Sequence, residues 1–335
     1  MRTWLIRFVV GLTVLAALLG GGVWQWLHSP LDLRIKPGED GVLVVVAAQS
    51  SAKQIARDVV KAGVDTSPWA LYAWFRWSGQ ARKIQAGTYE LALGTTPQQL
   101  LTKLVTGDQA LTRVALLEGW TFARMRRVVN EAAHLQHETA DWRDDSVMSA
   151  IGQDGVHPEG RFLPDTYVLA KNSSDLVLWR QAAESMSAAL AKAWSKRHPA
   201  CAAKTPEELL VLASMIEKET QHPEDRALVS AVLNNRLRIG MRLQSDPTII
   251  YGLGEAFDGN IRKRDLTTDG PYNSYTRNGL PPTPIANPSV AALMAAAQPA
   301  ASSAMYFVGK GDGTSHFSSS LREHNEAVRR YILKR

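Results

Sequence analysis

The chain has 335 residues, of which 45% are hydrophobic and 21% charged, and its formal net charge is +6. This composition excludes a chain that is disordered throughout, and the length exceeds that of an average single domain. The positive charge suits an anionic partner such as a membrane surface or a cell-wall polymer. No dense block of lysine and arginine occurs, so no nucleic-acid partner is expected. The one cysteine, Cys201, excludes an intramolecular disulfide.

Residues 1–30 predict a cytoplasmic tip followed by a transmembrane helix. No charged residue occurs from Phe8 to Leu27, a stretch long enough to cross a hydrocarbon core of about 30 Å. Arg2 and Arg7 precede it, so the positive-inside bias places the N-terminus in the cytoplasm and the rest of the chain outside. A cleaved signal peptide is the alternative. We favour a retained, single-pass anchor in the inner membrane, because the stretch is longer than the usual signal core.

Residues 31–112 predict a connector and a small strand–helix–helix–strand module, followed by one more helix. The pattern of apolar residues, caps and glycines predicts a strand over 42–46, helices over 51–63 and 67–77, a strand over 86–91 and a helix from 96 to about 107. The aromatic residues between Trp69 and Trp77 have helical spacing. That spacing favours core packing, with sugar stacking as the alternative.

Residues 113–335 predict one larger domain, so the fold class is α+β. Its first half is expected to hold a strand over 114–117, a helix from 121 to about 135, a loop over 137–146 and a long helix over 174–198. Its last part is expected to hold a strand over 305–308 and a closing helix that carries His324 and Asn325.

The helix that begins at Thr205 is the most strongly marked in the sequence. Thr205 and Glu208 have the spacing of a capping box, and Pro206 occupies the first helical position. Residues 209–216 are apolar on most sides of a helix, a pattern typical of a buried helix.

Two carboxyl groups, Glu217 and Glu219, follow at the C-terminal end of this helix, on opposite edges of the apolar stripe. Burial and the negative end of the helix dipole both disfavour a charged carboxylate there. Such a group is expected to keep its proton more readily than an ordinary glutamate, as a general acid must. Solvated charges on a frayed last turn are the alternative.

Further along the chain, a helix over 224–239 is expected to end at Gly240. Segment 241–252 interleaves polar and apolar side chains, which suits a polysaccharide groove or a solvated loop. The proline-rich segment 279–288 predicts an ordered, extended loop before a helix over 289–297. His157, His316 and His324 match no usual metal-ligand spacing, so neither a metal nor a cofactor is expected.

Six stretches of the chain resemble the endolytic murein transglycosylases, the MltG or YceG-like family, and follow that family's order. They are LLEGWT (116–121), EGRFLPDTY (159–167), LASMIEKET (212–220), NNRLRIGMRLQSDPTIIYG (234–252), YNSYTRNGLPPTPIANPS (272–289) and YFVGKGDGTSHFSSSLREHNEAV (306–328). Ser274, Thr283 and Ser289 stand where the family typically has Thr, Gly and Gly. The small module resembles the LysM-like unit of the family.

This resemblance implies an enzyme that cleaves the β-1,4 bond between MurNAc and GlcNAc in nascent peptidoglycan and leaves a 1,6-anhydroMurNAc end. By carry-over, Glu217 is the catalytic acid. The residues expected to contact sugar or to position Glu217 are Glu219, Gln244, Asp246, Tyr272, Asn273 and Asn325. The implied partners are glycan strands, the membrane, penicillin-binding proteins and other wall-synthesis proteins, and the catalytic domain is expected in the periplasm.

Three other functions remain open from the sequence. A muramidase would use water and leave a reducing end. A non-catalytic wall-binding scaffold would cleave nothing. A metal-dependent hydrolase would use His316 and His324.

Overall fold

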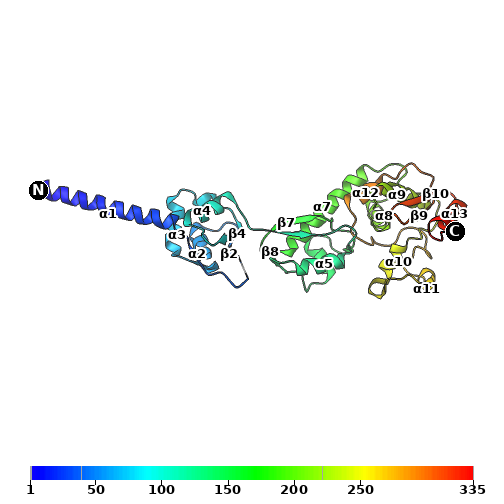
Figure 1. Ribbon diagram of the computed structural model, residues 1–335, viewed down its shortest axis with the longest axis horizontal. Coiled ribbons are helices and arrows are strands. Elements are labelled where there is room, and N and C mark those ends of the chain that lie inside the picture. The colour runs from blue at the N-terminus through cyan, green and yellow to red at the C-terminus, as the bar shows by residue number, and fades with distance from the viewer. Residues whose placement is uncertain (1, 39, 221, 335) are drawn as a thin grey trace. The chain divides into compact units, whose positions relative to one another are not determined.

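The computed structural model describes residues 2–38, 40–220 and 222–334 and divides the chain into two compact units. Unit 1 comprises residues 1–112 with 169–172, and unit 2 comprises residues 113–168 with 173–335. Both contain helices and strands (Figure 1). The mixed α+β class and the apolar N-terminal helix predicted from the sequence are confirmed.

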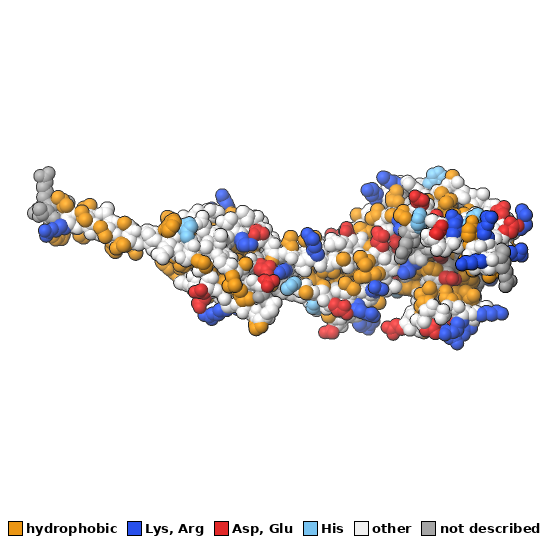
Figure 2. Space-filling view, in the orientation of Figure 1, with side chains coloured by type: hydrophobic (Ala, Val, Ile, Leu, Met, Phe, Trp, Pro, Cys, Tyr) orange, Lys and Arg blue, Asp and Glu red, His pale blue; other side chains and the backbone are white. Residues whose placement is uncertain are grey.

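Unit 1 begins with helix α1 (Arg2–His28). Residues Ile6–His28 of this helix are long and apolar enough to cross a membrane, and none of the most apolar part is buried in the protein. Hydrophobic side chains follow α1 along its length in Figure 2. The helix joins the rest of unit 1 directly, because Leu27 is buried and the Leu31 N–H donates to the Thr95 carbonyl at 2.9 Å.

The rest of unit 1 has the predicted strand–helix–helix–strand order. Strands β2 (Gly41–Val46) and β4 (Gly87–Ala92) pair antiparallel, with helices α2 (Ala52–Ala62) and α3 (Pro68–Trp77) between them in the chain. The remaining elements are β1 (Asp32–Leu33), β3 (Val64–Asp65), the 3-10 turn η1 (Ala81–Lys83) and helix α4 (Pro97–Thr106). Serine or threonine side chains cap all three helices after α1, as their local sequence predicts.

The first part of unit 2 differs from the sequence-based expectation in three places. Its elements are β5 (Leu111–Ala115), α5 (Phe122–Glu131), β6 (Leu135–Gln136), α6 (Asp144–Ala150), β7 (Thr166–Ala170) and β8 (Ser173–Ser174), of which β5 begins and β7 ends in unit 1. The strand expected over 114–117 begins three residues earlier and ends two residues earlier. Helix α5 ends four residues before the predicted Leu135, because Ala132 already has extended backbone angles. The predicted loop over 137–146 contains the start of α6, whose first turn carries two aspartates that favour a helix N-terminus.

The core of unit 2 is a group of four helices, α7 (Asp175–Ser195), α8 (Pro206–Glu219), α9 (Pro223–Arg238) and α12 (Val290–Ala297). Helix α8 packs against the other three and is buried from Leu209 to Glu217. The remaining elements are α10 (Asp246–Leu253), η2 (Gly254–Ala256), α11 (Lys263–Thr267), β9 (Tyr306–Gly309), β10 (Ser315–Ser318) and α13 (Leu321–Tyr331). From Asp246 onward, segment 241–252 forms helix α10 and is not a loop, and Thr248 and Ile249 of this helix are buried.

Candidate functional site

Helix α8 carries the predicted catalytic acid at its C-terminal end. Its start follows the sequence signal in part, since the Thr205 hydroxyl accepts a hydrogen bond from the Glu208 N–H at 3.1 Å. The Glu208 carboxylate instead accepts from the Lys204 N–H, so the capping box is only half formed. The long buried face of α8 fixes the helix in the core and so fixes the place of the groups that follow it.

Glu217 is buried, with 7% of its surface exposed, and its carboxylate has defined partners. Oε2 accepts hydrogen bonds from the Ser289 N–H, at 2.9 Å, and from the Ser289 hydroxyl. That hydroxyl in turn accepts from the Ala292 N–H at 3.1 Å, so Ser289 also caps α12. These hydrogen bonds fix the orientation of the Glu217 carboxyl group relative to the start of α12.

The loop at Gly119 also lies against the Glu217 side chain. Gly119 has a φ of +72°, and a Cβ there would lie 3.7 Å from the Glu217 Cγ. Lys218 Nζ donates to the Gly119 carbonyl at 3.3 Å, and the Gly119 N–H donates to the Asn287 carbonyl at 3.0 Å. The Glu217 side chain is therefore held between this loop and the start of α12.

A second carboxyl group, Glu159, is buried close to the same loops, with 4% of its surface exposed. Its Oε1 accepts from the Phe122 N–H at 3.0 Å and from Asn287 Nδ2 at 3.2 Å, and its Oε2 accepts from the Tyr251 hydroxyl at 3.2 Å. Burial raises the pKa of Glu159 to about 7, although the hydrogen bonds from Phe122 and Tyr251 act against that increase. Glu159 can therefore carry a proton near neutral pH.

The loop that carries Glu159 packs tightly on the proline-rich loop. Gly160 has a φ of +81°, and a Cβ there would lie 2.6 Å from the Pro284 Cβ, so only glycine fits. Asn287 completes the junction, since its Oδ1 accepts from the Phe162 N–H and its Nδ2 donates to the Trp120 carbonyl, both at 3.0 Å. These contacts join three of the sequence stretches that resemble the family.

Glu219 has a different set of neighbours from Glu217. Its Oε1 accepts from the Ser245 hydroxyl. Burial, followed by the negative charge of Asp246, raises the pKa of Glu219 to about 7, while the Ser245 hydrogen bond and the Arg236 charge lower it. The two glutamates of α8 thus contact separate loops, and they do not form a carboxyl pair.

Gln244 and Asp246 lie beside Ser245, at the loop that Glu219 contacts. Both are exposed. The Gln244 backbone has a φ of +50°, and its N–H donates to the Ser274 carbonyl at 3.1 Å. Asp246 Oδ1 accepts from the Tyr275 hydroxyl at 2.6 Å. These two residues and Glu219 are therefore brought together, next to the loop around residue 274.

Asn273 has a structural set of hydrogen bonds. It is buried, and its Nδ2 donates to the Asp265 and Thr268 carbonyls at 2.9 and 2.7 Å, while its Oδ1 accepts from the Tyr275 N–H at 2.9 Å. Both of its amide donors are already used, so Asn273 shapes this loop and has no donor left for a sugar.

Tyr272 connects a surface hollow to the buried network. The hollow has a volume of about 280 Å³ and is lined by residues 271–274 and 277–282. The Tyr272 hydroxyl shares a hydrogen bond of 2.7 Å with the Thr283 hydroxyl. Its ring packs edge-to-face on the Tyr251 ring, with centroids 4.9 Å apart, and Tyr251 donates to Glu159. Mixed aromatic and hydroxyl groups of this kind suit a carbohydrate.

Asn325 is not joined to these residues by any of the contacts described above. It is exposed on α13, and its side chain makes no hydrogen bond within the part of the chain that the structure describes. The buried residues Glu159 and Ser289 and the partly buried Tyr251 were not among those predicted individually. All three belong to the stretches that resemble the family, but no local pattern indicates that each contacts a residue far away in the sequence.

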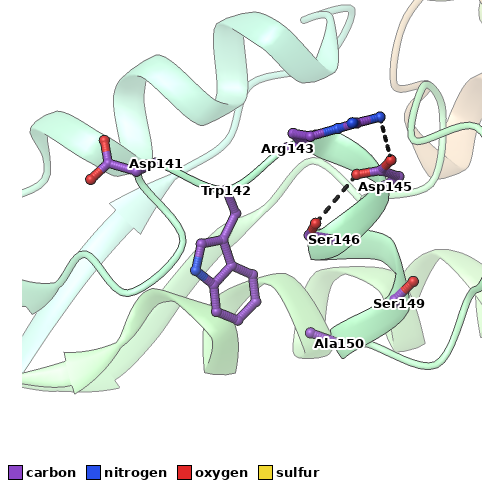
Figure 3. A pocket seen from close by; sticks show the side chains of 7 residues that line it. All are labelled: Asp141, Trp142, Arg143, Asp145, Ser146, Ser149 and Ala150. Atoms are coloured by element: carbon purple, nitrogen blue, oxygen red, sulfur yellow. Dashed lines mark hydrogen bonds and ion pairs between the residues drawn. The ribbon is translucent and has the colours of Figure 1, made fainter.

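Unit 2 contains a further hollow around the start of α6, with a volume of about 990 Å³ (Figure 3). Asp145 is joined there to Arg143 at 2.8 Å and to Ser146 at 3.3 Å. The two carboxylates that line this hollow, Asp141 and Asp145, are exposed, so the hollow lacks a buried acid. Across residues 2–38, 40–220 and 222–334, no three His, Cys, Asp or Glu side chains converge as metal ligands would.

Comparison with known proteins gives consistent results along the whole chain. Residues 44–330 match the profile of the YceG-like family. The chain is 28% identical to an endolytic murein transglycosylase of Bacillus subtilis, covering 94% of this chain and 91% of that protein. It is 25% identical to the same-named protein of Streptococcus pneumoniae D39, covering 97% of this chain and 65% of that longer protein. A crystal structure of a yceG-like protein from Listeria monocytogenes superposes with a TM-score of 0.55 at 26% identity, covering 86% of this chain and 98% of that one.

Proposed function

Because the chain belongs to the YceG-like family, we propose that it is an endolytic peptidoglycan transglycosylase with Glu217 as its catalytic acid. The observation that carries this proposal is a buried carboxyl group at the end of a core helix, oriented by two hydrogen bonds from Ser289. A general acid must hold a fixed position relative to the bond that it protonates.

The proposed reaction uses one carboxyl group twice. Glu217 first donates its proton to the oxygen that joins MurNAc C1 to GlcNAc C4, and the C1–O bond breaks. The muramyl C6 hydroxyl then bonds to C1 and returns its proton to the Glu217 carboxylate. The products are a 1,6-anhydroMurNAc end and a free GlcNAc 4-hydroxyl, and no water is consumed. A second nucleophilic carboxylate is therefore unnecessary.

The other predicted residues receive different roles in this proposal. Gln244, Asp246 and Tyr272 reach the surface and can contact sugar hydroxyls. Asn325, also exposed, is proposed as a sugar contact. Glu219 and Asn273 are enclosed by protein partners, so they are positioning residues.

The location and partners follow from the same family relationship. We propose that α1 is a retained inner-membrane anchor, with the rest of unit 1 and all of unit 2 on the periplasmic side. Unit 1 is proposed to be LysM-like, because it has a strand–helix–helix–strand order. Penicillin-binding proteins and other wall-synthesis proteins are the proposed partners.

A Glu217→Gln variant tests the catalytic role. Loss of a general acid lowers rates by about 10²–10⁴-fold, so cleavage of purified glycan strands should fall by at least about 100-fold. Glu224→Gln, at an exposed carboxylate of α9, is the matched control and should keep its activity. An unchanged rate in Glu217→Gln would exclude Glu217 as the acid. No cleavage by the unmodified protein would favour the scaffold.

Mass spectrometry of the new ends distinguishes the lyase from a muramidase. A 1,6-anhydro end is lighter by one water molecule than the reducing end left by hydrolysis. Reducing ends as the main product would contradict the transglycosylase proposal and support the muramidase. Activity that disappears in the presence of a chelator would instead support the metal-dependent hydrolase.

A further inference from the structure

Helix α3 of unit 1 has an unusual outer face. Its inner face buries Leu71 and Phe75 in the core. Its outer face carries Trp69 and Trp77, which are 75% and 76% exposed, with Ala73 between them. The spacing of four residues places these three side chains on one side of the helix. Phe75 of the aromatic stretch thus packs in the core as expected, whereas Trp69 and Trp77 are exposed on the outer face.

This outer face forms one wall of an apolar groove, and α1 forms the other wall. The groove has a volume of about 850 Å³, and its lining contains no charged side chain. On the α3 side it is lined by Trp69, Ala70, Ala73, Trp74 and Trp77, and on the α1 side by Leu18, Leu19, Gly20, Gly22, Val23, Trp24, Trp26 and Leu27.

The α1 wall of the groove, from Leu18 to Leu27, lies within the candidate membrane span. The span is Ile6–His28, and a hydrocarbon core takes about 20 helical residues. With the N-terminus in the cytoplasm, Leu18 to Trp24 lie in the outer half of the bilayer. The α3 face that lines the groove beside them must then lie at a similar depth. Tryptophan side chains favour this interfacial region.

We propose that the outer face of α3 is embedded in the outer leaflet, with lipid acyl chains filling the groove between α3 and α1. This inference rests on the proposed role of α1 as a retained anchor. A bilayer is the occupant that fits, because one wall of the groove is the span itself. A glycan would need side-chain hydrogen-bond acceptors as well as donors, and the only polar side-chain groups in the lining are tryptophan indole N–H donors. Arg76, exposed on α3, can reach lipid phosphates at the edge of the face.

Depth-dependent fluorescence quenching tests the proposal on the full chain in phosphatidylethanolamine–phosphatidylglycerol vesicles. Cys201→Ser removes the native thiol, and single cysteines then carry an environment-sensitive dye. Trp77→Cys probes the face, Leu18→Cys is the reference inside the span, and Lys53→Cys, exposed on α2, is the matched control. Trp69→Cys gives a second probe of the face if Trp77→Cys folds poorly.

Spin-labelled acyl chains should quench the dye at 77 several-fold more than the dye at 53, approaching the quenching at 18. Equal quenching at 77 and 53, with strong quenching at 18, overturns the embedded face but leaves the anchor intact. Weak quenching at 18, or a chain that has lost its first residues, contradicts the proposal that α1 is a retained membrane anchor. Protection of the dye at 77 by soluble glycan strands instead of lipid overturns the proposal in favour of sugar stacking. Strand cleavage, measured separately, reports on the catalytic proposal.

Discussion

Ser289 combines two functions in one hydroxyl group. The hydroxyl donates to the Glu217 carboxylate while it accepts from the Ala292 N–H at the start of α12. The orientation of the proposed acid therefore depends on a helix cap. The sequence identifies the cap, because a serine before an alanine-rich helix is a local signal. It cannot identify the contact with Glu217, which joins residues 72 positions apart.

Replacing Ser289 should affect both stability and the rate of strand cleavage. Ser289→Ala should reduce the free energy of unfolding by about 1 kcal/mol through loss of the cap. It also removes one of the two hydrogen bonds that orient the Glu217 carboxylate. A misplaced catalytic group can cost up to about 100-fold in rate, so strand cleavage should fall within that range. The measurements are urea unfolding and strand-cleavage rates at one pH.

Ser174 offers a matched control for this prediction. Its hydroxyl caps α7 through the Leu176 N–H at 3.2 Å and donates to the Glu138 carboxylate at 2.6 Å. Glu138 is exposed and lies outside the proposed site. Ser174→Ala should lose similar stability and keep its rate of strand cleavage. If both variants lose the same fraction of activity, the Ser289 hydroxyl has no particular effect on Glu217.

Glu159 should make the stability of unit 2 depend on pH. Its pKa is about 7 in the folded protein, against an ordinary value of 4.5, so between these values only the folded protein holds the proton. Protonation then favours the folded state, and the free energy of unfolding should fall by about 3 kcal/mol as the pH rises from about 4.5 to 7. Urea unfolding of the detergent-solubilised protein at several pH values measures this slope.

A Glu159→Gln variant isolates that contribution. Glutamine can still accept from the Phe122 N–H but does not titrate, so the slope should become shallower. Part of the slope should remain, because the pKa of Glu219 is also raised to about 7. Glu224→Gln, at an exposed position, should not alter it. An unchanged slope in Glu159→Gln would show that Glu159 is ionised throughout this range.

At the scale of elements, the sequence predicts those features of the fold that depend on neighbouring residues and misses those that depend on distant ones. The starts of α4, α8 and α12 are predicted because their caps and prolines lie within a few residues of each other. Helix α10 is missed although Ser245, Asp246 and Pro247 have the composition of a helix start, because it is only eight residues long and residues 241–245 before it alternate polar and apolar side chains. The shorter α5 and the start of α6 are likewise set by backbone conformation and packing that a hydrophobic pattern does not contain.

The candidate site is predictable to a similar extent. Glu217 is singled out by its place after a buried helix, and the family resemblance supports that choice. The junction of Glu159 with Tyr251 and Asn287 joins residues that are 92 and 128 positions apart in the chain, a range that no local pattern covers. Asn273 is a candidate by resemblance, but its hydrogen bonds assign it to the loop.

The contact between the Gly160 loop and the proline-rich loop can be tested with one methyl group. Gly160→Ala introduces both a left-handed alanine and a clash with Pro284, so it should reduce stability by about 3 kcal/mol and also reduce strand cleavage. Gly155→Ala is the control, since Gly155 has a φ of +71° and open space around it. It should lose about 1 kcal/mol and keep its activity. Equal losses in the two variants would show that the loops separate easily.

At the scale of the whole molecule, the fate of the first residues distinguishes an anchor from a signal peptide. A retained anchor predicts that the mature chain in membranes still contains the peptide from Arg7 onward, which mass spectrometry of the purified protein can detect. Protease added to spheroplasts should remove a C-terminal epitope, because the C-terminus is expected outside. A soluble chain that begins after Gly22 would identify the segment as a signal peptide.

The direct junction between α1 and the rest of unit 1 has a consequence for how the protein finds other molecules. With Leu27 buried and Leu31 bonded to Thr95, no free linker separates the span from the folded module. If α1 is the membrane anchor proposed above, the chain would diffuse in the plane of the bilayer and would not explore the depth of the wall. Its search would be two-dimensional, so its encounters would concentrate on whatever is attached to the same surface, and mature wall farther out would stay beyond the reach of unit 1.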